Sequence, residues 1–303
     1  MTLVGVDELA SHDGFVQYGP PAIATLWSMG QTYTERRAAP ALAGHLSCVW
    51  VQRVSSDAAP YAHRTVPNGG VEVSCRLGSA PRVIGPQSGP TEEVLAPGTA
   101  VVGVRFRPGT VPAALGVPAA EVVDLELGAD ELWGGCAEAV GERLASAASP
   151  EDAAALLEQE ILARLRSAAP PDPVVAAGVR RLIRAREVTS LTSTLHISES
   201  QLRRRFRAAT GFSPKAVHRM LRFQGFLALA AQRERPSEEI ALLAAEAGYA
   251  DQSHLTREAL RLAGQTPRTL LRESERHCRG SHDHAASYAP LLAGVTTGPA
   301  THR

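Results

Sequence analysis

The chain has 303 residues, of which 44% are hydrophobic and 20% are charged, and its 31 basic residues balance its 31 acidic ones. This composition is typical of a globular protein with room for two domains, each with its own core. We find neither a signal peptide nor a run of about 18 apolar residues, so the sequence predicts a cytoplasmic protein without a membrane-spanning segment.

The four cysteines, Cys48, Cys75, Cys136 and Cys278, lie far apart and form no CxxC pair. A disulfide framework is not expected in a chain of this size without an export signal. Cys48 and Cys75 fall in strand-like runs, where a buried inert thiol is the first interpretation and a redox or metal sensor is the alternative. We therefore expect no metal and no cofactor.

The balanced total conceals an uneven distribution of charge along the chain. Residues 1–174 carry 11 Arg and 20 acidic residues, whereas residues 175–276 carry 18 Lys and Arg and 10 acidic residues. A basic module beside an acidic one is typical of a polyanion-binding unit joined to a unit with another task. Charge alone does not establish this, since solvated basic helices are common.

Residues 15–126 read as short strands separated by turns rich in glycine and proline. Apolar or alternating runs cover residues 23–27, 45–53, 71–77 and 100–106. Several strands at this spacing predict an antiparallel sandwich or a small barrel.

The pattern then changes to that of helices, at residues 132–145 and 150–166. Ser149 is predicted to cap the second of these helices, because Pro150 and two acidic residues follow it. This pair of helices could pack on the barrel, form a dimer interface, or do both. The proline-rich stretch 167–173 is the predicted hinge.

Two segments at an offset of 53 residues resemble each other. SQLRRRFRAATGFSP (residues 200–214) aligns with SHLTREALRLAGQTP (residues 253–267) and shares Ser, Leu, Arg, Gly and Pro at matching positions. A short apolar helix is predicted upstream of each copy. Internal repeats of this kind are a primary signal of architecture.

Each copy contains the parts of a helix-turn-helix unit. Ser198 and Asp251 are predicted to cap the second helix of their units, and Gly248 permits the turn in the second copy. Gly211 and Gly264 are predicted to end the capped helices, because glycine readily adopts the left-handed conformation that often follows the last turn of a helix.

A long helical pattern over residues 215–235 connects the two copies. Roughly twenty residues span about 30 Å, and major-groove segments on one face of DNA repeat about every 34 Å. The connection therefore predicts a strut that holds two recognition helices about one turn of DNA apart.

One face of each capped helix is apolar and the opposite face is polar. The outward side chains suit hydrogen bonding to base edges and phosphates in a major groove. They are Ser200, Gln201, Arg203, Arg204 and Arg207 in the first copy, and Gln252, Ser253, His254, Thr256, Arg257 and Arg261 in the second. Arg204 and Arg257 are central on their faces, and we expect each to make a bidentate contact to guanine. A solvated basic face is the alternative, which the matched pair of copies makes less attractive.

Residues 175–275 resemble the AraC/XylS family of bacterial transcription regulators. LRRRFRAATGFSPKAVHRMLRFQGFLALA and IALLAAEAGYADQSHLTREALRLAGQTP carry the resemblance. It implies two helix-turn-helix subdomains on either side of a linker helix. It also implies base contacts from Ser200, Arg204, Gln252, Ser253 and Arg257. Two positions depart from the family, which usually has an aromatic residue where Ala259 stands and a basic residue where Leu260 stands; this puts the packing of the second subdomain in doubt.

The N-terminal half is similar to a barrel-like domain found ahead of such DNA-binding pairs in actinobacterial regulators. VPNGGVEV, VIGPQ, VVGVRFRPGTVPAALGVPAAEVVDLEL and DELWGG carry this resemblance, which implies no particular ligand. His45 and His63 are isolated and are interpreted as structural rather than metal-binding.

We expect an apolar effector pocket in this domain, with four residues contributing to its lining: Trp27, Trp50, Arg105 and Phe106. Arg105 and Arg107 share a strand face. They could pair with an anionic ligand or with acidic residues of the same domain, and the second is the safer interpretation.

Together these patterns predict an α+β protein. Residues 1–128 are expected to form an antiparallel β-barrel or cupin-like effector-binding domain, and residues 129–173 a helical hairpin that connects the domains or mediates dimerisation. Residues 174–276 are expected to form an all-α DNA-binding domain of two helix-turn-helix subdomains joined by a linker helix. Residues 277–303, with a cluster of three histidines and Cys278, are expected to be a disordered tail without a metal site.

The sequence predicts a non-enzymatic, nucleoid-associated transcription regulator that responds to a small-molecule effector. Its expected partners are double-stranded DNA at two adjacent major-groove segments, the effector, RNA polymerase and a second copy of the chain, with no membrane. A ligand-independent DNA-binding adaptor is one alternative. A cupin-like enzyme fused to a DNA-binding module is the other, although no GxSxG, P-loop, HExxH or dinucleotide motif is present.

Overall fold

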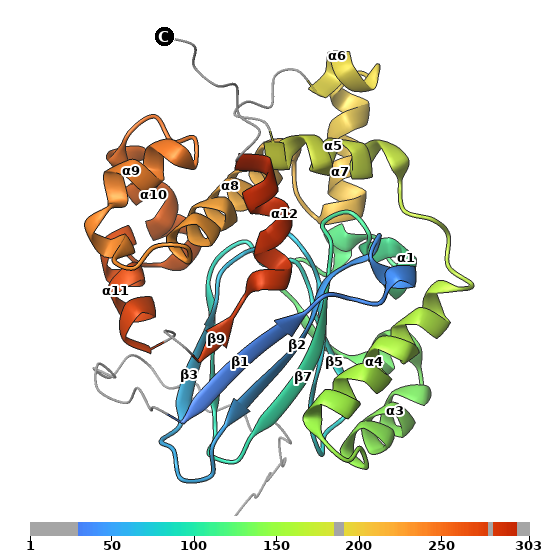
Figure 1. Cartoon of the computed structure of the whole chain (residues 1–303). Coiled ribbons are helices and arrows are strands. Elements are labelled where there is room, and N and C mark those ends of the chain that lie inside the picture. The colour runs from blue at the N-terminus through green and yellow to red at the C-terminus, as the bar shows by residue number, and fades with distance from the viewer. Residues whose placement is uncertain (1–29, 185–190, 278–280, 296–303) are drawn as a thin grey trace, which may run out of the picture.

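The computed structural model describes residues 30–184, 191–277 and 281–295 (Figure 1). Seven strands form one sheet in the order β8-β5-β4-β7-β2-β1-β9, and two strands form a second sheet, β3-β6. The strands are β1 (Gln31–Arg36), β2 (Leu46–Val54), β3 (Tyr61–Thr65), β4 (Glu72–Arg76), β5 (Arg82–Ile84), β6 (Thr91–Leu95), β7 (Ala100–Phe106), β8 (Glu126–Gly128) and β9 (His282–Asp283). The strand predicted at 23–27 and Trp27 lie outside the described residues.

The central strands β2, β4 and β7 of the large sheet are buried on both faces. β2 pairs antiparallel with β1 on one side and with β7 on the other. Successive side chains of a strand point to opposite faces, so Val49 and Val51 of β2 enter one hydrophobic core while Cys48 and Trp50 enter another. This burial explains why β2 reads as a nearly continuous apolar run rather than as a clean alternation.

One face of the sheet is covered by the predicted helical hairpin, in which α4 lies against β7 and β2 (Figure 1). Leu157 and Ile161 of α4 are fully buried in the core that they share with the sheet. The cap at Ser149 is confirmed, since its hydroxyl oxygen accepts a hydrogen bond from the Asp152 backbone N–H at 3.1 Å. The helices of this half are η1 (Pro40–Leu42), α1 (Val111–Leu115), η2 (Ala119–Glu121), α2 (Ala129–Trp133), α3 (Cys136–Ala145) and α4 (Pro150–Leu165).

The α+β architecture is therefore confirmed, with a β-rich N-terminal part followed by a helical C-terminal part. The sheet does not close into a barrel, because β8 and β9 form its two edges. The small β3-β6 sheet lies outside this hydrogen-bonded ladder and covers part of the face opposite α4.

The C-terminal part contains two helix-turn-helix units on either side of α8, as the repeat predicts (Figure 1). Its helices are α5 (Pro173–Arg184), α6 (Leu191–Leu195), α7 (Glu199–Thr210), α8 (Pro214–Ala230), η3 (Pro236–Glu238), α9 (Ile240–Glu246), α10 (Gln252–Ala263) and α11 (Pro267–His277). The linker helix α8 ends at Ala230, earlier than the pattern over 215–235 predicts, because the backbone N–H groups of Gln232 and Arg233 bond three residues back in turns.

The linker helix is buried on two opposite faces. Val217 and Leu221 belong to the core of the first unit, together with Phe206 of α7. Phe223 and Phe226 belong to the core of the second unit. At about 100° per residue these two pairs lie on opposite sides of the helix. A single rigid element therefore joins both units.

The C-terminal segment corrects the sequence prediction. Residues 281–295 do not form a disordered tail but the short strand β9 and the helix α12 (Ala285–Val295). β9 adds to β1 in parallel, and α12 packs on α5 and α8 as well as on β1 and β2 (Figure 1). The apolar run YAPLLAGV supplies the buried face that makes this order possible: Leu291 is buried in the core of the first helix-turn-helix unit.

Three further contacts join the two halves. The Gln224 side-chain amide of α8 donates hydrogen bonds to the carbonyl oxygens of Val66 and Pro67, at 3.3 and 3.0 Å. Arg64 of β3 and Glu273 of α11 form an ion pair at 3.8 Å. A Cβ on Gly211, at the end of α7, would lie 2.4 Å from Val123, so glycine permits this close approach.

We predict that Leu291→Ala lowers the free energy of unfolding by about 2–3 kcal/mol, because it leaves a cavity where α12 meets α5 and α8. Chemical denaturation of the full chain measures this. The matched control is Leu242→Ala, since Leu242 is half exposed, and its effect should stay within about 0.5 kcal/mol. Equal effects of the two substitutions would show that α12 contributes nothing to the fold.

Candidate nucleic-acid interface and effector pocket

The first recognition helix, α7, presents the predicted polar face to solvent. Leu202 and Phe206 are buried on its inner side. The outward residues of the prediction are all exposed: Ser200, Gln201, Arg203, Arg204 and Arg207. Arg203 also pairs with Glu199 one turn earlier, which occupies its guanidinium in the absence of DNA.

The second recognition helix, α10, repeats this arrangement. Leu255 and Leu262 are buried in the core of the second unit. Four of the predicted outward residues are exposed, namely Gln252, Ser253, Arg257 and Arg261, and two are half-buried, namely His254 and Thr256. The Thr256 hydroxyl donates to the Gln252 carbonyl oxygen at 2.9 Å, so that it is engaged within the helix.

His254 has structural partners that the sequence did not reveal. Its Nε2 lies 3.3 Å from the Arg222 guanidinium of α8, and its ring packs edge-on against Tyr249. The Arg222 guanidinium stacks over the Tyr249 ring at 4.4 Å. These contacts fix α10 to α8 and leave His254 less able to reach a base than its exposed neighbours.

The caps and turns that orient both helices follow the prediction. The Ser198 hydroxyl oxygen accepts from the Gln201 backbone N–H at 3.3 Å, and the Asp251 carboxylate accepts from the His254 backbone N–H at 2.6 Å. Gly211 and Gly264 end α7 and α10 in the left-handed conformation, with φ of 80° and 69°.

The two departures from the family pattern lie on different sides of α10. Ala259 is fully buried against the second core. Leu260 is 49% exposed, so an apolar side chain stands in solvent where the family usually has a basic one.

The predicted effector residues fall in different environments. Trp50 lines a cavity between the two sheets. Phe106 is fully buried in the core beneath α4 and lines neither of the two cavities described below. Arg105, one residue earlier in β7, points to the opposite face of the sheet, as the alternation of a strand requires.

Arg105 pairs with acidic residues of its own domain, which was the safer of the two interpretations. Its guanidinium bonds Glu72 at 2.7 Å and Glu35 at 3.0 Å. Burial opposes ionisation of Glu35, but contact with His284 and the charge of Arg105 outweigh it and hold the pKa of this carboxyl well below its usual range. Burial likewise raises the pKa of the neighbouring Tyr33 phenol, which stays neutral. The network is therefore an ionised, buried structural cluster.

Cys48 and Cys75 fit the interpretation of buried, inert thiols. Cys48 and Cys75 are fully buried and Cys136 is exposed. Burial raises the pKa of the Cys48 thiol, and it raises the pKa of Cys75 to about 11. Thiols this weakly acidic are poor nucleophiles and poor metal ligands at neutral pH.

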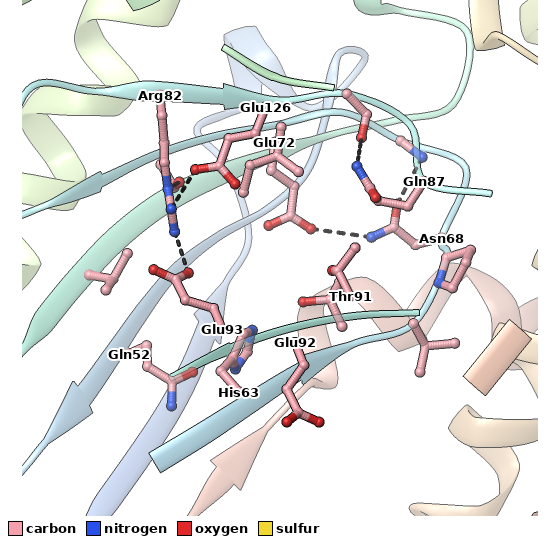
Figure 2. A pocket seen from close by; sticks show the side chains of 18 of the residues that line it. Gln52, His63, Asn68, Glu72, Arg82, Gln87, Thr91, Glu92, Glu93 and Glu126 are labelled. Atoms are coloured by element: carbon pink, nitrogen blue, oxygen red, sulfur yellow. Dashed lines mark hydrogen bonds and ion pairs between the residues drawn. The ribbon is translucent and has the colours of Figure 1, made fainter. Parts of the chain in front are cut away.

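A cavity of about 190 Å³ lies between the large sheet and the β3-β6 pair (Figure 2). Two of its wall carboxylates, Glu93 and Glu126, pair with Arg82 of the same wall, whereas Glu72 and Glu92 pair with arginines outside it. Figure 2 shows Arg82 reaching both Glu93 and Glu126, the second at 2.6 Å, and the Asn68 amide donating to Glu72 at 3.2 Å.

Three residues that line this cavity each carry a buried, neutral polar atom that lacks a hydrogen-bond partner within the part of the chain that the structure describes. These atoms are Trp50 Nε1, Gln52 Oε1 and His63 Nδ1. Leaving such a group buried and unpaired costs about 1–3 kcal/mol. Sequence reasoning missed Gln52 and treated His63 as structural. A glutamine inside the apolar run LSCVWVQRV was the available signal, because polar residues are rarely buried there without a partner.

A second cavity, of about 400 Å³, lies where the domains meet. Its lining combines Tyr61 and His63 of β3 with Leu227 of α8, Leu271 of α11 and Tyr288 of α12. The arrangement brings the tail histidines His282 and His284 beside Tyr33. No cluster of His, Cys, Asp or Glu suited to a metal ion occurs among the described residues.

Two capped helices with exposed polar rows, each closing a helix-turn-helix unit, define a DNA-binding protein of the helix-turn-helix class. Comparison with sequence families agrees, since residues 191–273 match a helix-turn-helix domain and residues 34–127 match a domain of unknown function, DUF6597. Residues 191–273 thus carry a helix-turn-helix domain of the AraC type, which confirms the resemblance found in the sequence. No curated protein matches the chain.

Among solved structures, forms of ToxT from Vibrio cholerae are similar to this chain. The apo form of a ToxT variant is 12% identical, with a TM-score of 0.42, and the match covers 78% of this chain and 98% of that one. ToxT with a bound unsaturated fatty acid is 11% identical, with a TM-score of 0.38, over 80% of this chain and 95% of that one. TM-scores this low do not establish a common fold.

We predict that Arg105→Met lowers the free energy of unfolding by about 3–5 kcal/mol, because it leaves Glu35 and Glu72 buried without their countercharge. Denaturant titration of the full chain measures the loss. Arg107→Met, one residue past the end of β7, is the matched control. Its guanidinium donates to the Ala43 carbonyl oxygen, and its removal should cost about 1 kcal/mol. A loss for Arg105→Met no larger than that of the control would contradict the structural role of the cluster.

Proposed function

We propose that the chain is a sequence-specific transcription regulator whose helices α7 and α10 enter two adjacent major-groove segments of double-stranded DNA. The exposure of matched polar rows on both helices carries this proposal: Ser200 and Arg204 on α7 correspond to Ser253 and Arg257 on α10, and all four face solvent. Arginine at a central position suits bidentate contact to guanine, and the flanking serines suit phosphate or base contacts.

The linker helix supports the same geometry. Its 17 residues span about 25 Å, of the same order as the roughly 34 Å between major-groove segments on one face of DNA. Because α8 is buried on two faces, it holds both units at a fixed separation. A pair of units placed in this way reads two half-sites with one protein chain.

We infer that the N-terminal domain binds a small-molecule effector, which shifts the population of arrangements that bind DNA. Two cavities lined by polar and apolar groups support this inference. A ligand-independent adaptor remains the competing function, and it predicts that neither cavity has an occupant. RNA polymerase and a second copy of the chain are the further partners that we propose.

We propose a role without catalysis, in the cytoplasm and on the nucleoid where the DNA target lies. Four of the five carboxylates that line the first cavity are held in ion pairs with arginines rather than left free to act on a substrate. None of the described helices is long and apolar enough to cross a membrane.

We predict that Arg204→Ala and Arg257→Ala each weaken binding to the cognate site by about 5- to 150-fold, because each removes a bidentate base contact worth about 1–3 kcal/mol. Gel-shift titration with DNA from a genomic binding-site selection measures the affinity. Preference between the cognate site and a site mutated at the contacted guanine should fall as well.

Arg205→Ala is the matched control for charge. Arg205 lies on the same helix as Arg204 and is also exposed, but its guanidinium pairs with Asp172 at 3.1 Å and is directed away from the outward row. Its loss should change affinity by less than about threefold. If Arg204→Ala and Arg257→Ala retain both the affinity and the sequence preference of the unsubstituted protein, the assignment of α7 and α10 to the groove is wrong.

A further inference from the structure

The cavity between the two sheets is partly open to solvent and has a mixed wall. Apolar side chains contribute part of it, among them Ile84, Leu95 and Val101. Polar side chains from both sheets face them, and Figure 2 shows Gln52 and His63 directed toward the same space as Glu93. With a volume of about 190 Å³, the cavity is slightly larger than an engineered cavity of about 150 Å³ that takes up benzene. It has room for one ring with one or two small substituents.

Among the residues that the structure describes, the wall offers no buried, unpaired charge to a charged ligand. Four of its five carboxylates pair with arginines, and the fifth, Asp124, lies at an exposed position and accepts hydrogen bonds from Ser88. Glu72 bonds Arg105 at 2.7 Å, Glu126 bonds Arg82 at 2.6 Å, and Glu92 bonds Arg64 at 2.9 Å. Glu93 is shared between Arg82 and Arg76. An anion entering the cavity would meet these carboxylates, and a cation would have to compete with arginines that already neutralise them.

Three uncharged groups, in contrast, are available. Trp50 is 6% exposed and Gln52 is 1% exposed. The Trp50 indole N–H is a donor and Gln52 Oε1 is an acceptor, and neither has a partner among the described residues. Burial lowers the pKa of His63, so its imidazole is neutral, and its partnerless Nδ1 can donate or accept according to its tautomer.

We propose that this cavity is the effector site and that it binds a small uncharged ring compound. The ligand carries an acceptor for the Trp50 indole N–H and a donor for Gln52 Oε1, while its ring packs against the apolar wall. This assignment rests on the proposed function in one respect, namely that the N-terminal domain is the sensor. The chemistry of the ligand follows from the cavity alone.

The cavity also has a direct connection to the DNA-binding part. Val66 and Pro67 line it, and their carbonyl oxygens accept the two hydrogen bonds from Gln224 of α8. A ligand that shifts the loop after β3 therefore acts on the helix that holds both recognition helices. The loop at the cavity wall is therefore joined directly to the linker helix by hydrogen bonds.

The test is a ligand panel on the full chain, followed by calorimetric titration without DNA. Phenol, benzamide and 2-pyridone are the uncharged probes, and benzoate and benzylamine are the charged controls of similar size. At least one uncharged probe should raise the melting temperature and bind at least tenfold tighter than the charged ones. Binding of none of the uncharged probes, or equal binding of the charged ones, overturns the proposal.

Gln52→Leu should weaken the affinity for the probe by about five- to tenfold, as expected for one lost hydrogen bond. Gln232→Leu, at an exposed position, is the matched control and should leave probe affinity unchanged. Should Gln52→Leu not fold, the Trp50 indole N–H resonance of ¹⁵N-labelled protein, assigned through Trp50→Phe, replaces it as the readout. A probe that binds without shifting this resonance binds elsewhere, which also overturns the proposal.

Gln224→Leu separates sensing from DNA binding. This variant should keep the affinity of the probe but lose its effect on DNA affinity, because the connection from the loop after β3 to α8 is cut. Probe binding is measured without DNA, and DNA binding is measured without probe. Failure of the cavity assignment is therefore distinguishable from failure of the regulator assignment. An undiminished effect of the probe in Gln224→Leu overturns the proposed route.

Discussion

The burial of α8 on two opposite faces is the constraint on which the rest of the molecule depends. One face closes the core around Phe206 and the other closes the core around Phe226. A helix packed on both sides cannot rotate or slide without opening a core, because protein interiors are close-packed. Both recognition helices therefore move with α8 as one body, and anything that contacts α8 acts on both of them. The proposed reading of two DNA segments follows from this rigidity.

Two parts of the sequence that contact this helical body are β3 with the loop that follows it and the C-terminal segment. The loop after β3 meets α8 through Gln224, β3 meets α11 through Arg64, and α12 packs on α5 and α8. The tail also extends the large sheet through β9. The C-terminal segment thus connects the DNA-binding part to the sheet, because it packs against both. These contacts fix the relative position of the two parts, which therefore does not depend on the 167–173 hinge alone.

The large sheet separates two chemical environments within the N-terminal part. On the α4 side, Phe106 and its neighbours form a hydrophobic core. On the opposite side, Arg105 is buried among carboxylates, and a polar cavity opens toward the β3-β6 pair. Two adjacent residues of β7 therefore have different roles: Phe106 packs in the hydrophobic core, and Arg105 forms ion pairs on the other face. A buried ion cluster stabilises little by itself but is costly to break, which makes it suited to fixing the shape of an adjacent pocket.

The sequence by itself determined the two helix-turn-helix units. The repeat, the caps at Ser198 and Asp251, and the outward rows of α7 and α10 follow from local rules of spacing and capping. They could therefore be predicted without knowledge of tertiary contacts. The sequence also indicated the sheet and the hairpin on it. Only the tertiary structure decided which face of β7 meets which core, that β9 and α12 are ordered, and that Gln52 and His63 share a cavity. Those features arise from contacts between residues far apart in the chain, and a local pattern carries no information about its distant partner.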